Sequence, residues 1–264
     1  MRKILVLLIA AALTLCAGCA NFNIYSEAQE NALGVEAYGE ATKEYPLITS
    51  GPDYEMVQRV GRRIADASGK DYDWEFRLLR ADDMVNAFCL PGGKVAVYTG
   101  ILRYTQNENG LAAVMGHEVA HATMRHGGKR MTNAMILQAT AAAIGVGLSM
   151  SEMSTEAQAG LMAAFGVGTQ VGVSLPFSRG HETEADLEGI RYAVRAGYDP
   201  YEAVRLWERM AQDGNGGPEW LSTHPDSLGR AKKLEQEIPR IVQEEGKSAV
   251  PQPQPNAPMK QIRR

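Results

Sequence analysis

The motif His-Glu-Val-Ala-His at residues 117–121 constrains this chain more than any other stretch of its sequence. Histidines four residues apart lie on one face of a helix, so the imidazoles of His117 and His121 can bind one metal ion. Glu118 lies beside them, placed to take a proton from an attacking water molecule rather than to bind the metal. The pattern therefore predicts a zinc site on a helix.

The helix around this motif has boundary signals at both ends. Apolar residues recur through it at helical spacing, and Asn107 or Asn109 is the expected N-cap. Gly127-Gly128 is the expected C-terminal stop. His126 follows His121 by five positions, which on a continuous helix points it to a different face. We interpret it as a helix-end residue and not as a metal ligand.

A third zinc ligand is expected on a second helix, opened by the acidic segment 178–186. Glu182 and Asp186 are four residues apart and share a face, so Glu182 can bind zinc while Asp186 accepts the outer N–H of a ligand histidine. Glu184 is interpreted as a solvated or structural carboxylate. His181 is the alternative ligand, although it lies about 100° around the helix from Glu182. The alternative for the whole segment is a solvated helix start.

Four segments together resemble one known family. The motif at 117–121 followed by Ser-Arg-Gly-His-Glu-Thr-Glu-Ala-Asp at 178–186 resembles the gluzincin metallopeptidases of the HtpX, Oma-type and CAAX prenyl endopeptidase family. The segments 86–93 and 222–225, with Arg230, look like the same family and occur in the same order. The resemblance is closest to soluble lipoproteins of the bacterial envelope such as LoiP and BepA.

This resemblance covers about residues 50–240 and implies a zinc metalloendopeptidase. Its third ligand falls on Glu182 and its acidic partner on Asp186, which gives one Zn²⁺ per chain bound by His117, His121 and Glu182. The expected fold is α+β and mostly helical, a zincin-like metallopeptidase domain with a small β-sheet beside the 117–121 helix.

Two further residues gain roles from the resemblance. In the similar lipoproteins the histidine matching His224 can approach the zinc, so His224 is expected to be a fourth ligand that gates the site. Its alternative is an ordinary histidine at a helix N-terminus before Pro225. Arg230 or His224 could also stabilise an oxyanion as a catalytic donor, and Arg230 could instead pair with a carboxylate.

Strands are expected upstream of the motif helix. Residues 73–79 predict a strand, and 85–90 with 94–98 predict a hairpin around Pro91-Gly92-Gly93. The resemblance places this hairpin in the substrate cleft. We therefore expect strand addition by an extended peptide, with Asn86, Val95 and Val97 as substrate-binding residues. The alternative is ordinary sheet and turn chemistry.

The N-terminus predicts an envelope protein. Residues 1–18 fit a lipoprotein signal peptide, with Cys19 as the lipidated residue. A plain signal peptide cleaved near Ala17 or Ala20 is the alternative. Because Ala20 is not the aspartate that retains lipoproteins in the inner membrane, the resemblance implies an outer-membrane lipoprotein that faces the periplasm.

Four parts are expected along the chain: signal peptide 1–18, N-terminal helical arm 19–50, metallopeptidase domain 51–245 and a disordered Pro/Gln-rich tail 246–264. Within the domain, the apolar runs 134–150 and 157–175 predict a helical hairpin that is buried or lies against a membrane, and helices that span the membrane are the alternative.

These features predict an endopeptidase that degrades misfolded or unassembled outer-membrane proteins and is latent through the His224 gate. Its expected partners are such substrates, the membrane through the lipid anchor, and the outer-membrane assembly machinery. A net charge of −4 gives no sign of nucleic-acid binding. A periplasmic chaperone with little proteolysis and a cell-wall amidase are the alternatives.

Overall fold

The computed structural model describes residues 22–136, 178–212 and 227–245, together with Trp220, Ser222 and His224. The expected signal peptide, the lipidation site Cys19, residues 137–175 of the apolar segment and the C-terminal tail lie outside the described residues. Of the helices that the structure describes, none combines the length and apolar character needed to cross a membrane.

The chain divides into two compact units, Met1–Ser26 with Gly127–Leu175, and Glu27–His126 with Pro176–Arg264. In the first unit, residues 127–136 are helical and the Thr132 hydroxyl accepts a hydrogen bond from the Ile24 backbone N–H at 3.1 Å. The second unit contains the predicted site and is described below.

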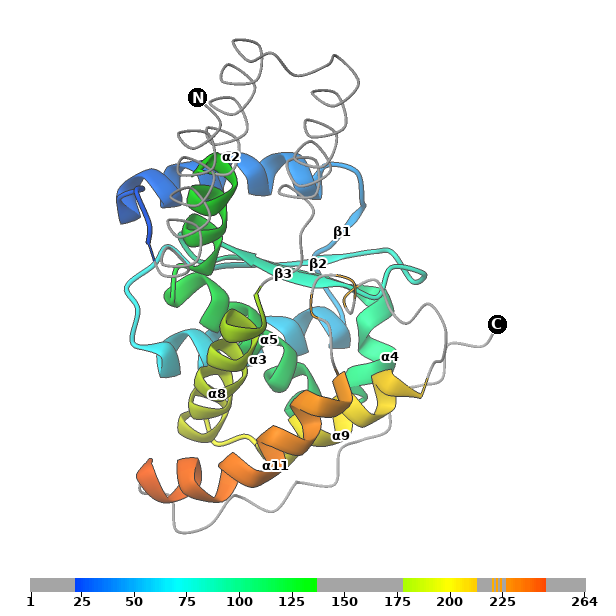
Figure 1. The fold of residues 1–264 in the computed structure, drawn as a ribbon. Coiled ribbons are helices and arrows are strands. Elements are labelled where there is room, and N and C mark those ends of the chain that lie inside the picture. The colour runs from blue at the N-terminus through cyan, green and yellow to red at the C-terminus, as the bar shows by residue number, and fades with distance from the viewer. Residues whose placement is uncertain are drawn as a thin grey trace, which may run out of the picture. The chain divides into compact units, whose positions relative to one another are not determined.

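A four-stranded sheet forms the centre of the second unit, in the order β1-β2-β4-β3 (Figure 1). Its strands are β1 (Leu47–Ile48), β2 (Glu75–Leu79), β3 (Ala87–Leu90) and β4 (Lys94–Tyr98). The strands β3 and β4 form the predicted antiparallel hairpin, and β4 also pairs with β2 in parallel. The strand β4 is therefore an interior strand, and β3 forms an edge of the sheet.

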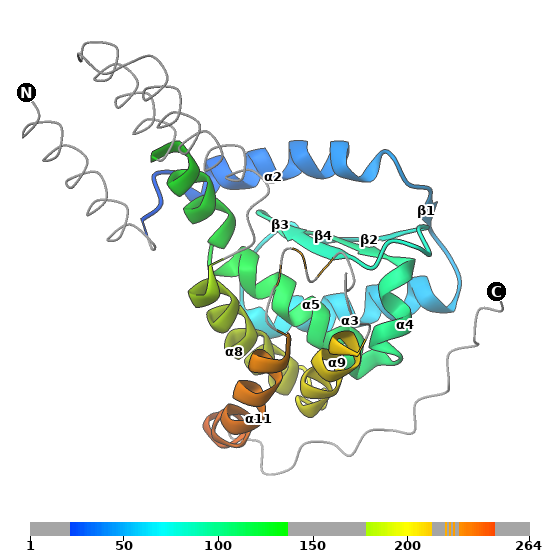
Figure 2. The same cartoon turned by 45° about the vertical axis from the view of Figure 1, so that its right-hand side comes forward.

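Alternating side chains of β4 divide between two apolar layers. Ala96 and Tyr98 pack with Tyr38 of α2 (Glu27–Thr42). The Tyr38 hydroxyl donates a hydrogen bond to the Val95 carbonyl at 2.6 Å. Val95 and Val97 point to the other face, into the main core. Figure 2 shows α2 on one side of the sheet and α3 (Pro52–Ser68) and α5 (Glu108–Thr123) on the other.

The remaining helices complete the core around α5. The short η1 (Thr99–Ile101) and α4 (Leu102–Thr105) lead from the sheet into α5. Helix α8 (Arg179–Arg195) crosses α5, and α9 (Tyr201–Ala211) and α11 (Ser227–Glu244) pack around the pair. This mostly helical arrangement with a small sheet beside α5 confirms the expected α+β class.

The crossing of α5 and α8 depends on two glycines. A Cβ atom added to Gly189 would lie 2.8 Å from the Gly116 carbonyl carbon and from the His117 backbone nitrogen. The two backbones therefore touch, directly before His117 on α5 and about one turn after Asp186 on α8. This contact sets how closely the ligands of α5 and α8 approach one another.

The two ends of α5 differ from each other in how well the sequence predicts them. Asn107 is the N-cap, accepting a hydrogen bond from the Gly110 N–H at 2.9 Å. At the other end the helix stops at Thr123, before the expected glycine stop at residues 127–128. Arg125 takes a left-handed conformation with φ 59°, and a new helix begins at His126. The expected stop was wrong because a non-glycine residue makes the turn.

Candidate metal centre

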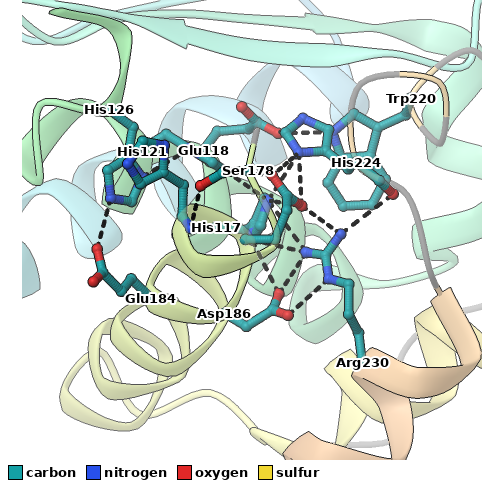
Figure 3. Close-up of polar contacts among 12 residues, drawn as sticks. His117, Glu118, His121, His126, Ser178, Glu184, Asp186, Trp220, His224 and Arg230 are labelled. Atoms are coloured by element: carbon teal, nitrogen blue, oxygen red, sulfur yellow. Dashed lines mark hydrogen bonds and ion pairs between the residues drawn. The ribbon is translucent and has the colours of Figure 1, made fainter. Parts of the chain in front are cut away.

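Four buried side chains converge between α5, α8 and the segment before α11 (Figure 3). Helix α5 contributes His117 and His121, and α8 contributes Glu182 in its first turn, where Ser178 caps the helix. His224 completes the group. One ligand atom from each residue lies within 4.8 Å of all the others.

The spacing of these atoms fits a tetrahedral metal site. The Nε2 atoms of His117 and His121 are 3.1 Å apart, and His224 Nδ1 is 3.2 Å from His117 Nε2. Glu182 Oε1 is 3.3 Å from His121 Nε2 and 3.0 Å from His224 Nδ1. Zinc bonds of about 2.0–2.1 Å in a tetrahedron separate neighbouring ligand atoms by roughly 3.3 Å. The histidine nitrogens and the carboxylate oxygen thus lie at the separations that a zinc ion requires.

The charges around the cluster also favour a divalent cation. The carboxylates of Glu118, Glu182 and Asp186 and the guanidinium of Arg230 are all buried. With neutral histidines their formal charges sum to −2. Buried charge is unfavourable unless it is compensated, and one divalent ion in the cluster would neutralise it. The residues present therefore fit a bound zinc ion.

The outer nitrogen of His117 meets a charged pair. Its Nδ1 is 3.1 Å from Asp186 Oδ1, as expected for the partner of a ligand histidine. Asp186 accepts two hydrogen bonds from Arg230, at 2.7 and 2.6 Å, and Arg230 also contacts Glu182 at 2.6 Å. The guanidinium lies over the Trp207 ring at 3.7 Å. Of the two roles considered for Arg230, the geometry favours pairing with carboxylates.

The outer nitrogen of His121 meets a residue that helix periodicity placed elsewhere. His126 is fully buried, its Nδ1 is 3.0 Å from His121 Nδ1, and its Nε2 is 3.1 Å from Glu184 Oε2. The expectation that His126 faces away was wrong, because the turn at Arg125 brings the chain back toward the cluster. His181, the alternative ligand, stacks on His126 and is not part of the four-residue group.

Glu118, the residue between the two ligand histidines, contacts Trp220 and His224. The indole N–H of Trp220 donates a hydrogen bond to Glu118 Oε1 at 2.7 Å, and His224 Nε2 lies 3.3 Å from the same oxygen. The Trp220 backbone N–H donates to the Val85 carbonyl, just before β3. No motif in the sequence points to Trp220, so its contact with Glu118 was not predicted.

The buried environment shifts the pKa values of two of the four candidate ligands, His121 and Glu182. Burial lowers the pKa of His121 well below its ordinary value, and the neighbouring His117 and His224 add to this effect. Burial alone would raise the pKa of Glu182, but hydrogen bonds with His121 and His224 hold it below its usual range. A neutral imidazole and an ionised carboxylate are the forms that bind a metal.

The residues expected to bind substrate lie in two different settings. Val95 and Val97 are fully buried in β4, which is paired on both sides, so this strand cannot receive an added strand. That expectation was wrong because β4 is interior rather than exposed. Asn86 lies directly before the edge strand β3, where its side chain accepts a hydrogen bond from the Ala87 N–H at 2.9 Å.

Comparison with known proteins gives the same family. Residues 53–238 match the profile of peptidase family M48. The chain is 37% identical over 225 residues to the mitochondrial metalloendopeptidase OMA1 of Schizosaccharomyces pombe, covering 83% of this chain and 64% of the relative. It is 32% identical over 219 residues to the beta-barrel assembly-enhancing protease of Yersinia pestis, covering 78% and 44%. It is 31% identical over 230 residues to the protein of that name from Escherichia coli, covering 81% and 46%.

The chain thus spans less than two thirds of the length of each of these relatives. The matched region contains α5, α8 and the start of α11, which contribute the converging side chains. The resemblance seen in the motifs is confirmed. The chain belongs to peptidase family M48.

Proposed function

We propose that the chain is a zinc-dependent endopeptidase whose metal is held by His117, His121 and Glu182. The observation that carries the proposal is the spacing of the buried ligand atoms. The distances from His117 to His121 and His224, and from Glu182 to the three histidines, are 3.0–3.6 Å, and one ligand atom from each of the four residues lies within 4.8 Å of all the others. The uncompensated buried charge supports it. A bound zinc ion would supply Lewis acidity, lowering the pKa of a water molecule and polarising the scissile carbonyl.

The chain's own residues supply the proton transfers. Glu118 follows His117 directly and is the base proposed to accept a proton from the attacking water and return it to the leaving amine. Asp186 holds His117 through its outer nitrogen, and Arg230 holds both Asp186 and Glu182. Arg230 thus orients two carboxylates around the metal site.

His224 is proposed to keep this enzyme latent. Its Nδ1 stands among the ligand atoms, and a zinc ion with four protein ligands has no open position for water. Trp220 and His224 also engage Glu118, the proposed base. Activity therefore requires the segment that carries both residues to move away.

Degradation of casein, an unfolded protein, tests this function. We expect slow cleavage by the zinc-loaded chain, faster cleavage by His224→Ala, and a loss of about 10²-fold or more in Glu118→Gln. Glu108→Gln is the matched control: it removes the same charge from the same helix, where Glu108 pairs with Arg59. Cleavage that persists in Glu118→Gln would contradict the proposed mechanism.

The proposed substrates are misfolded or unassembled outer-membrane proteins. The support is the name of the bacterial relatives, beta-barrel assembly-enhancing protease. The edge strand β3 offers a place for an extended peptide, and Asn86 lies at its start. We also propose attachment to the outer membrane through a lipid on Cys19. Labelling with a radioactive fatty acid, lost in Cys19→Ala, would test the anchor.

A second candidate function is that of a periplasmic assembly factor with little proteolysis. The engagement of Glu118 by Trp220 favours it, because this contact holds the base away from catalysis. Complementation of a deletion strain by Glu118→Gln separates the two functions. Full complementation favours the assembly factor, and none favours the peptidase.

A further inference from the structure

The pattern of hydrogen bonds behind His121 allows one assignment of protons. If Nε2 of His121 faces the metal, its Nδ1 carries the proton and donates it. His126 Nδ1, 3.0 Å away, must then accept, so the proton of the neutral His126 ring is on Nε2. That nitrogen lies 3.1 Å from Glu184 Oε2, which can accept. Each donor in this sequence meets an acceptor.

The surroundings of His126 hold its ring in this place. Arg125 adopts a left-handed conformation that only a fixed environment makes favourable for a non-glycine residue. Its guanidinium donates to Glu30 at 2.8 Å, and the Glu30 side chain is 1% exposed. On its face, the His126 ring stacks against His181, with centroids 4.3 Å apart and planes 13° apart. The turn and the stacking together fix the ring against rotation.

From this geometry we infer that His126 and Glu184 are positioning residues for the metal site. His126 orients His121 and fixes its tautomer, and Glu184 in turn fixes the tautomer of His126. The inference rests on the proposed zinc site. It gives a role to a carboxylate on the surface of α8 that is 42% exposed and outside the ligand group.

Zinc affinity of the metal-free chain, measured by competition with a chromophoric chelator, tests the inference. We expect His126→Ala to weaken binding about 10–100-fold and Glu184→Gln about threefold to tenfold. Glu188→Gln is the matched control, since it removes the same charge one turn along α8, where Glu188 pairs with Arg191. It should bind zinc like the parent chain.

A double-mutant cycle distinguishes positioning from a general effect of packing or charge. In His126→Asn the amide oxygen can replace Nδ1 as the acceptor for His121 but cannot extend to Glu184. We expect His126→Asn to bind zinc more tightly than His126→Ala, and Glu184→Gln to have no further effect in the Asn background. Glu184→Gln should also leave the urea midpoint of the metal-free chain unchanged, because the side chain is partly exposed.

The outcomes separate this inference from the proposed function. If the parent chain does not bind zinc, or if Glu182→Ala binds it as tightly as the parent, the metal site itself is wrong. If Glu182→Ala abolishes binding while His126→Ala and Glu184→Gln bind like the parent, only the positioning role is overturned. Independent, additive effects of the two substitutions would overturn it as well.

Discussion

The two histidines of the 117–121 motif differ in what their Nδ1 atoms, which do not face the metal site, contact. His117 contacts the carboxylate of Asp186 directly, and Asp186 is 7% exposed and bound by two nitrogens of Arg230. His121 contacts a carboxylate only through the ring of His126, and that carboxylate belongs to the partly exposed Glu184. One metal site thus has a buried end and an end that reaches the surface.

The difference separates stability from metal binding. Removing one member of a buried charged pair leaves the other without compensation, which strongly destabilises a fold. An exposed carboxylate contributes little to folding, so Glu184 can influence the metal without being needed for the structure. The buried end therefore supports the fold and the site together, and the outer end acts mainly on the site.

The largest expected effect comes from breaking the buried end. Asp186→Ala should lower the free energy of unfolding of the metal-free chain by about 3–5 kcal/mol, because buried Arg230 loses one of its two carboxylate partners and His117 loses the carboxylate at its outer nitrogen. Glu184→Ala should change it by less than about 1 kcal/mol. Urea denaturation measures both. Equal effects of the two substitutions would remove the distinction between the ends.

The glycine contact between α5 and α8 tests the rigidity of the same end. Gly189→Ala should destabilise the chain by about 1–3 kcal/mol, because its Cβ would lie 2.8 Å from backbone atoms of α5. Gly180→Ala on the same helix has space, with its nearest neighbour 3.7 Å away, and should stabilise by about 0.5–1 kcal/mol. Thermal or urea unfolding of the two substituted chains measures both effects. A stabilising Gly189→Ala would show that α5 and α8 can separate freely.

The two ends of the metal site should also differ, by a smaller amount, in how they make the free energy of unfolding depend on pH. The folded-state pKa of His121 is below its unfolded value. The free energy of unfolding is therefore unaffected by this group above about pH 6.5. Below that pH it falls by up to about 1.4 kcal/mol per pH unit, because the unfolded chain binds the proton more readily. Burial alone would raise the pKa of Asp186, but Arg230 lowers it, so that end keeps its contribution down to about pH 4.

Urea midpoints of the metal-free chain at pH 7.5 and 5.5 measure this difference. We expect a lower midpoint at pH 5.5, and a weaker pH dependence in His121→Gln because the titrating ring is gone. A midpoint that does not change with pH in the parent chain would contradict the account.

The sequence predicted the parts of the molecule that depend on local periodicity. The positions of His117, His121, Glu182 and Asp186 follow from four-residue spacing on two helices, and the structure brings them together. The hairpin also followed from turn chemistry, with its strands at Ala87–Leu90 and Lys94–Tyr98.

The missed features depend on where a helix ends and how strands are ordered. A left-handed Arg125 cannot be anticipated from its residue type, so the place of His126 and the role of Glu184 were not predicted. The parallel pairing of β2 with β4 joins strands that are not neighbours in the chain. Without that pairing, β4 looked like a free edge.

Zinc content of the purified chain tests the central claim most directly, after loading with excess zinc and gel filtration. The account predicts about one zinc ion per chain in the parent and in Glu184→Ala, and none in Glu182→Ala. Zinc retained by Glu182→Ala and lost by Glu184→Ala would contradict it, since the third ligand would then be the carboxylate that contacts His126.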